Sequence, residues 1–216
     1  MSVIAILQAR MSSVRLPGKV LMPLFGMPML LVMLDRVLAS KRLDKVIVAT
    51  STDKTDNVIF DFCIKNGIGC FRGSLTDVLD RYYQAAMVFI PHHVVRLTAD
   101  CPLINTEIMD RTIEKHLDGG FDFTANFGFP DGYDVEVMTL EALSRAWREA
   151  SIPEEREHVT SYIRNNPDKF RIGRLENSQN MSHVKISVDT QEDYQRLKAL
   201  VEILLPSSIS IWLKTQ

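Results

Sequence analysis

The chain has 216 residues, 46% of them hydrophobic and 24% charged, which suffices for one globular domain with a sizeable core. Its net charge is −2, so the composition excludes bulk nucleic-acid binding, and any cationic site must be local. The first apolar run is too short for a signal peptide or a membrane span. The three cysteines, Cys63, Cys70 and Cys101, match no zinc or redox spacing. We therefore expect a soluble cytoplasmic protein with reduced thiols that binds neither nucleic acid nor a membrane.

In the first half of the chain, strand-length apolar runs alternate with segments of helical periodicity. The expected strands are residues 3–7, 45–51, 68–71 and 92–98, and the expected helices are residues 29–39, 55–66, 74–89 and 105–117. This alternation predicts an α/β fold with a mostly parallel sheet and helices on both faces. Ligands of such sheets bind beyond the carboxyl ends of the strands, so the loops that follow the first and fourth strands are the expected binding region.

The second half has a different pattern, with strands separated by turn-rich segments. The expected strands are residues 121–127, 133–140, 169–176 and 183–189, and the expected helices are residues 140–150, 151–165 and 191–205. Ser151 and Glu154 have the spacing of a helix capping box. Without a repeat or a long linker, residues 1–216 are expected to form one domain with a small lid or dimerisation insert near 127–180. The tail, with Ile209, Ile211 and Trp212, is expected to pack on the domain or on a partner.

A cationic loop follows the first expected strand. The stretch LQARMSSVRLPGKVL covers residues 7–21 and places Arg10, Arg15 and Lys19 within ten residues. Such a loop at a strand end is suited to binding a polyphosphate, although a solvated surface loop would have the same composition. It is not a Walker A loop, because Gly18-Lys19 is followed by Val20, and it does not match G-x-G-x-x-G.

The same stretch is similar to the opening signature of the cytidylyltransferases that activate acidic sugars, which include the CMP-acylneuraminate and CMP-Kdo synthetases. It most resembles the spore coat polysaccharide biosynthesis (SpsF) type. Further segments resemble this family in the same order, namely VIVATSTD, FRGSLTDVLDRY, VVRLTADCPLI, PDGYDVEV, EREHVTSYI and VDTQEDYQRL. The likeness spans residues 3 to about 200 and implies a Rossmann-like, GT-A-like nucleotidyltransferase with three α/β/α layers.

The resemblance also implies how CTP would bind. Residues near cytosine would be Leu7 and Ala9, those on the triphosphate would be Arg10, Arg15 and Lys19, and Ser12 and Ser13 would donate hydrogen bonds to phosphate oxygens. After the third strand, Gly73 allows close backbone approach and Ser74 can hydrogen-bond the base or the ribose.

Two aspartates are candidate Mg²⁺ ligands. Asp100 follows the fourth strand and Asp189 follows the segment VKISV, and each is also a residue type that commonly begins a turn or caps a helix. The related synthetases carry metal-binding aspartates in similar contexts. Sialic-acid synthetases have two aspartates, two residues apart, where this chain has Ser187 and Asp189, which leaves the number of metal ions open.

The acceptor side of the site is less well marked. Arg81 can contact a ligand or pair with Asp77 one helical turn before it, and a cation such as Arg96 inside an apolar strand requires a phosphate, an acceptor carboxylate or a neighbouring acid. Asp134 and Glu136 lie on one face of an expected strand, where they would bind sugar hydroxyls or form a solvated edge. The resemblance places Glu157 and His158 near the acceptor, and a charged surface helix is the alternative.

The function that follows is transfer of CMP from CTP to a sugar acid, with Mg²⁺ as cofactor and pyrophosphate as the second product. The catalytic candidates are Arg10, Lys19 and Asp100. Alternatives are a sugar-phosphate nucleotidyltransferase that uses another NTP, or a nucleotide-binding protein without catalysis. The relatives are commonly dimers, so a homodimer is expected.

Overall fold

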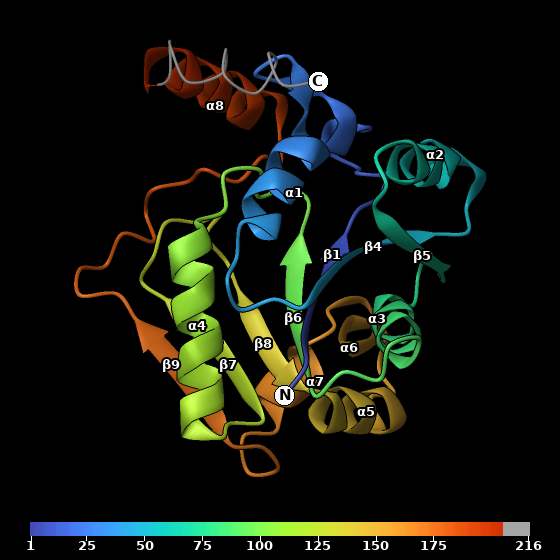
Figure 1. Ribbon diagram of the computed structural model, residues 1–216, viewed down its shortest axis with the longest axis vertical. Coiled ribbons are helices and arrows are strands. Elements are labelled where there is room, and N and C mark those ends of the chain that lie inside the picture. The colour runs from blue at the N-terminus through green and yellow to red at the C-terminus, as the bar shows by residue number, and fades with distance from the viewer. Residues whose placement is uncertain (205–216) are drawn as a thin grey trace.

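A computed structural model describes the backbone of residues 1–204 and the side chains through residue 201. Seven strands form one sheet in the order β5-β4-β1-β6-β8-β7-β9 (Figure 1). Their bounds are β1 Val3–Gln8, β4 Lys45–Ser51, β5 Gly69–Gly73, β6 His93–Thr98, β7 Phe123–Phe127, β8 Glu136–Thr139 and β9 Ile172–Glu176. Only β8, among these seven, runs antiparallel to its neighbours. The prediction of an α/β fold with a mostly parallel sheet is confirmed.

Helices cover both faces of the sheet (Figure 1). They are α1 Met29–Leu38, α2 Asn57–Lys65, α3 Val78–Met87, α4 Thr106–Gly119, α5 Leu140–Glu149, α6 Pro153–Glu157, α7 Ser161–Asn165 and α8 Gln191–Leu204. Strand β1 shows why three layers form: Val3, Ala5 and Leu7 pack in a core with α1, α2 and α4, whereas Ile4 and Ile6 pack in a second core with α3, α5 and α7. Because both faces are buried, the strand reads as a continuous apolar run.

A third apolar cluster joins α8 to α1 and to a small hairpin. The hairpin consists of β2 Pro23–Leu24 and β3 Met27–Pro28, and it follows the 3₁₀ helix η1 Lys19–Leu21. A second 3₁₀ helix, η2 Lys54–Asp56, precedes α2. The tail containing Ile209, Ile211 and Trp212 lies outside the described residues, so its expected packing stays a prediction.

One predicted helix is wrong in its extent. Residues 151–165 form two short helices, α6 and α7, with Val159 and Thr160 buried between them. The turn lets the Thr160 hydroxyl donate to Glu136 at 2.9 Å, a tertiary contact that local periodicity cannot show. The capping box is also absent, because α6 begins after Ile152 with Pro153 in its first turn and no side-chain cap.

The predicted strand at 183–189 is also wrong. Its residues make one isolated bridge, between Asp131 and Lys185, and their other backbone hydrogen bonds go to loops. Polar and apolar residues alternate in this segment as they do in a strand, but none of the described strands pairs with it along its length.

The helix predicted at 74–89 begins later, at Val78, after Asp77 caps it by accepting the Asp80 N–H.

The span 127–180 contains two strands of the main sheet, β8 and β9, together with α5, α6 and α7. Helices α5 and α6 pack against α3, so these elements belong to the layer that covers one face of the sheet. Whether part of this span acts as a lid or a dimer contact stays a prediction. Within residues 1–204, none of the helices combines the length and apolar character that a bilayer crossing requires.

Candidate active site

Two neighbouring cavities lie at the carboxyl edge of the sheet. Gln8 at the end of β1 pairs in register with Thr98 at the end of β6, so the loops after these strands are adjacent. A cavity of about 230 Å³ lies beside the loop after β1, and a cavity of about 470 Å³ lies over β6, β7 and β8. Thr98, Asp100 and Asp189 line both cavities. We call the smaller one the nucleotide cavity and the larger one the acceptor cavity, after the ligands proposed for them below.

The loop after β1 is closed at its neck. The Gly18 N–H donates to the Met11 carbonyl at 2.9 Å, and Gly18 adopts a left-handed backbone with φ of 73° that favours glycine. This closure turns the chain back so that η1 begins at Lys19, directly beside the cavity. Cations from the loop therefore face the nucleotide cavity, which is lined in part by Arg10, Ser13, Arg15 and Lys19.

The ammonium group of Lys19 joins the two candidate metal ligands. Its Nζ lies 3.4 Å from a carboxylate oxygen of Asp100 and 3.1 Å from one of Asp189, and it donates to the Val188 carbonyl at 2.7 Å. Lys19 is only 8% exposed, whereas Arg15, which contacts Asp189 at 2.9 Å, has a side chain that is 64% exposed. Asp100 and Asp189 therefore both contact the ammonium group of Lys19, at the boundary between the cavities.

Backbone geometry brings Asp189 beside Asp100. The Val188 N–H donates to the Asp100 carbonyl at 2.8 Å. Asp189 does not cap α8, because the Thr190 hydroxyl accepts the Asp193 N–H at 3.2 Å, and Asp193 in turn accepts the Asp189 and Thr190 N–H groups. Partial burial raises the pKa of the Asp189 carboxyl, but hydrogen bonds and charge from Lys19 and Lys185 outweigh this and hold the pKa below its ordinary value. Asp189 is therefore an available anionic ligand.

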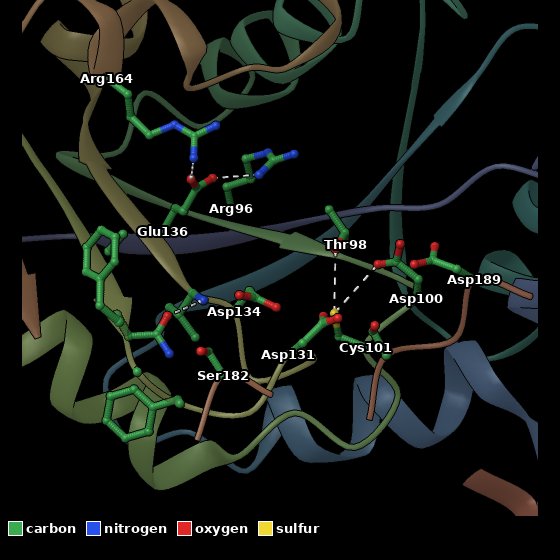
Figure 2. Close-up of a pocket in the computed structure, with 17 residues that line it drawn as sticks. Arg96, Thr98, Asp100, Cys101, Asp131, Asp134, Glu136, Arg164, Ser182 and Asp189 are labelled. Atoms are coloured by element: carbon green, nitrogen blue, oxygen red, sulfur yellow. Dashed lines mark hydrogen bonds and ion pairs between the residues drawn. The ribbon is translucent and has the colours of Figure 1, made fainter. Parts of the chain in front are cut away.

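An ion pair forms the far wall of the acceptor cavity (Figure 2). Arg96 Nη1 donates to Glu136 Oε2 at 2.6 Å, and Glu136 Oε1 accepts the Thr160 hydroxyl. Arg164 lies 3.9 Å from the same carboxylate, and its side chain is 53% exposed. Arg96 and Thr160 thus occupy both oxygens of Glu136 at short distance, and the longer contact from Arg164 leaves about half of its side chain exposed at the cavity wall.

Two further acids, Asp131 and Asp134, line the same cavity without a cationic partner among the described residues. The turn that holds them is locked, because the Asp131 carbonyl accepts the Ile186 and Ser187 N–H groups at 2.7 and 3.0 Å. The pKa of Asp134 is raised because its carboxyl is recessed in the cavity, and nearby Asp131, Glu136 and Asp100 add to the rise. This part of the cavity is suited to hydrogen-bond donors such as sugar hydroxyls.

Comparison with known proteins decides the family. A family model described as Cytidylyltransferase matches residues 4–214.

The chain belongs to the cytidylyltransferase family.

Individual relatives agree with this assignment. The chain is 38% identical over 207 residues to the spore coat polysaccharide biosynthesis protein SpsF of Bacillus subtilis, covering 93% of this chain and 86% of that one. A solved cytidylyltransferase from Leptospira borgpetersenii matches with a TM-score of 0.90 at 35% identity, over 99% and 93% of the two chains. A CMP:2-keto-3-deoxy-manno-octonic acid synthetase complexed with CTP shares the fold, with a TM-score of 0.73 at 17% identity over 95% and 100%. The resemblance drawn from the motifs is confirmed, and the protein is an enzyme, a nucleotidyltransferase.

The cytidylyltransferase brings some of the expected nucleotide residues to the cavity and not others. Leu7 and Ala9 are buried in the core, so their side chains are not free to stack on a base. Ser12 is exposed and lines neither cavity, and Gly73 and Ser74 also lie outside both linings.

Of the acceptor candidates, Arg96, Asp134 and Glu136 come together in the acceptor cavity, and the other three do not. Arg81 is fully buried and donates to the Ser74 carbonyl at 2.7 Å, while Asp77 pairs with Arg156 instead. Neither role expected for Arg81, ligand contact or pairing with Asp77, is the one that the structure shows. Glu157 and His158 are exposed at the end of α6 and line neither cavity.

Several cavity residues were not among the candidates. They include Asn126, Asp131, Arg164, Ser182 and Ser187. Asp131 lies in the turn-rich segment before Asp134 and Glu136, and Arg164 has no local signal, because it reaches the cavity through the turn between α6 and α7. Ser187 is 5% exposed, and its hydroxyl has no partner among the described residues.

Proposed function

We propose that this cytidylyltransferase transfers CMP from CTP to a sugar acid of the nonulosonic type and releases pyrophosphate, in the synthesis of a surface polysaccharide. The observation that supports this most directly is the junction of a cation-lined cavity and a larger polar cavity at Asp100 and Asp189. The name of the Bacillus subtilis relative supports a polysaccharide pathway, and the CTP complex of the same fold supports the nucleotide.

In this proposal the triphosphate lies in the nucleotide cavity. Arg10, Arg15 and Lys19 supply the positive charge, and Ser13 supplies a hydroxyl donor at the cavity wall. Leu7 and Ala9 contribute through their backbone, and the base extends toward Gly73 and Ser74. As charge develops on the leaving pyrophosphate, Arg10 and Lys19 stabilise it by fixed electrostatic interactions.

The donor set at the junction fits a divalent cation. Two carboxylates already surround one cationic group, Lys19 Nζ, and Mg²⁺ is commonly held by one or two carboxylates together with substrate phosphates. Within the described residues there is no cluster of three or more acidic, histidine or cysteine ligands, so the phosphates would complete the coordination. Mg²⁺ held by Asp100 and Asp189 would neutralise charge on the α-phosphate and lower the pKa of the attacking hydroxyl.

The acceptor would occupy the larger cavity with its reacting hydroxyl toward Asp100. That oxygen forms a bond to the α-phosphorus as the bond to pyrophosphate breaks, and the proton of the hydroxyl passes to solvent water. Arg164 would bind the sugar carboxylate, while Asp131 and Asp134 would accept hydrogen bonds from hydroxyl groups. A homodimer in the cytoplasm is part of the same proposal.

The test is pyrophosphate release from CTP, UTP, GTP and ATP, each with a panel of sugar acids and matched neutral sugars, with and without Mg²⁺. Release with CTP and a sugar acid, dependent on Mg²⁺, is the expected result. Preference for another NTP with a sugar phosphate would replace the proposal with the alternative nucleotidyltransferase. Thermal shifts with each NTP separate binding from turnover, because a ligand that binds only the folded state raises the melting temperature.

A further inference from the structure

One fully buried carboxylate outside both cavities accepts a hydrogen bond from the backbone of the cationic loop. Asp56 is 0% exposed, and its Oδ1 accepts the Met11 N–H at 2.7 Å. Met11 is the residue whose carbonyl accepts the Gly18 N–H and closes the neck of the loop. The same peptide segment is therefore held on both sides, by Gly18 within the loop and by Asp56 from outside it.

The other oxygen of Asp56 is fixed to the sheet. Asp56 Oδ2 accepts the Ser51 hydroxyl at 2.5 Å and the Ser51 N–H at 3.2 Å, and Ser51 is the last residue of β4. Asp56 also directly precedes α2, so its own backbone is fixed by that helix. A carboxylate with both oxygens occupied in this way is a rigid link between the loop and the central sheet.

A buried cation has a similar position at Gly73 and Ser74, the second segment expected to contact the nucleotide. Arg81 is also 0% exposed and donates to the Ser74 carbonyl. Burial lowers the pKa of Arg81, the charge of Arg10 lowers it further, and the carboxylates of Asp56 and Asp77 counteract this. Two buried side chains of opposite charge thus each fix the backbone of one segment, and neither side chain is accessible to a ligand.

We propose that Asp56 is a positioning residue for nucleotide binding: by holding the Met11 N–H, it fixes the neck of the loop so that Arg10 and Lys19 face the triphosphate before CTP arrives. This rests on the proposed function, because it assumes that the loop binds CTP. Preorganisation of this kind raises affinity by removing the cost of ordering the loop on binding.

The test compares Asp56→Ala with Ser51→Ala. Both variants remove the hydrogen bond between the two side chains, but only Asp56→Ala removes the acceptor for the Met11 N–H. We expect Asp56→Ala to raise the Kd and KM for CTP about tenfold or more, with kcat at saturating CTP nearly unchanged, and Ser51→Ala to leave the Kd within about twofold. Equal loss in both variants, or normal CTP affinity in Asp56→Ala, would overturn the proposal.

A measurement on the unmodified protein covers the case in which Asp56→Ala does not fold. Without CTP, hydrogen exchange at the Met11 amide should be slowed relative to the exposed amide of Val14 by about a hundredfold or more. Equal, rapid exchange at both amides would overturn the proposal. If the unmodified enzyme binds no CTP while the Met11 amide is protected, the proposed function fails and the link through Asp56 remains.

Discussion

The two cavities differ in how their charges are balanced. In the nucleotide cavity, Lys19 and Arg15 contact the aspartates at the junction, so cations and anions pair before any ligand binds. In the acceptor cavity, Glu136 is paired, but Asp131 and Asp134 have no cationic partner among the described residues. The first arrangement favours a polyanion that exchanges one set of ion pairs for another, whereas the second favours a ligand rich in hydrogen-bond donors.

The largest expected effect is at the junction that both cavities share. Asp100→Asn keeps the size of the side chain and removes its charge, so CMP transfer should fall roughly a thousandfold or more, a barrier increase of several kcal/mol. Turnover assays and melting curves of the variant measure this, with Asp118→Asn on the exposed side of α4 as the control. Near-normal turnover in Asp100→Asn would remove Asp100 from the mechanism.

The second prediction compares the contributions of a buried cation, Lys19, and an exposed cation, Arg15, to CTP binding. Lys19→Met should weaken CTP binding by about 1.5–3 kcal/mol, the scale of a charge-assisted hydrogen bond, and Arg10→Ala should have a similar effect. Arg15→Gln should cost less than about 1 kcal/mol, because the Arg15 side chain is largely exposed. Titration calorimetry with CTP gives the comparison, and unchanged affinity in Lys19→Met would contradict the assignment of the triphosphate site.

The acceptor cavity should respond independently of the nucleotide cavity. Arg164→Gln should raise the KM for the sugar acid about tenfold, because it removes the cation proposed to bind the carboxylate, and it should leave the KM for CTP unchanged. Arg171→Gln, with a 70% exposed side chain outside both linings, is the matched control. A parallel rise in the KM for CTP would show that the two cavities are not separate.

The smallest effect concerns stability. Since the pKa of Asp134 is raised in the folded state, its ionisation destabilises the folded protein as the pH rises above the ordinary pKa, and the full loss is present above the raised pKa. Asp134→Asn should therefore stabilise the protein at pH 7 by less than about 1 kcal/mol, and the gain should vanish below the ordinary pKa of 3.8, where both states are protonated. Melting temperatures across this pH range test it, and a gain that persists below pH 3.8 would refute the electrostatic cause.

The parallel half of the sheet could be predicted because its information is local. Residues 3–7 and 45–51 are continuous apolar runs, and the helices between the strands have clear periodicity. The break before Thr160 could not be predicted, because it depends on a hydrogen bond to Glu136, 24 residues earlier in the chain. Residues 183–189 alternate like a strand, but their backbone partners lie in loops.

The two cavities also differ in how far their residues could be predicted from local sequence. The nucleotide cavity draws five lining residues from one short segment, Arg10 to Lys19, so a motif reveals it. The acceptor cavity draws Asp131, Arg164 and Ser187 from separate segments that only the folded chain brings together. Arg81 shows what a motif leaves open: the sequence allowed ligand contact or pairing with Asp77, whereas the structure buries Arg81 and directs it to the Ser74 carbonyl.

The closed neck of the cationic loop makes its tip a convenient place for a reporter group. Val14 is 94% exposed at this tip and also lines the nucleotide cavity. A Val14→Cys variant that carries an environment-sensitive dye would place the fluorophore beside the proposed nucleotide site without disturbing the core. Of the three native cysteines, Cys63 and Cys101 are buried and only Cys70 is partly exposed, so selective labelling requires one replacement, Cys70→Ser.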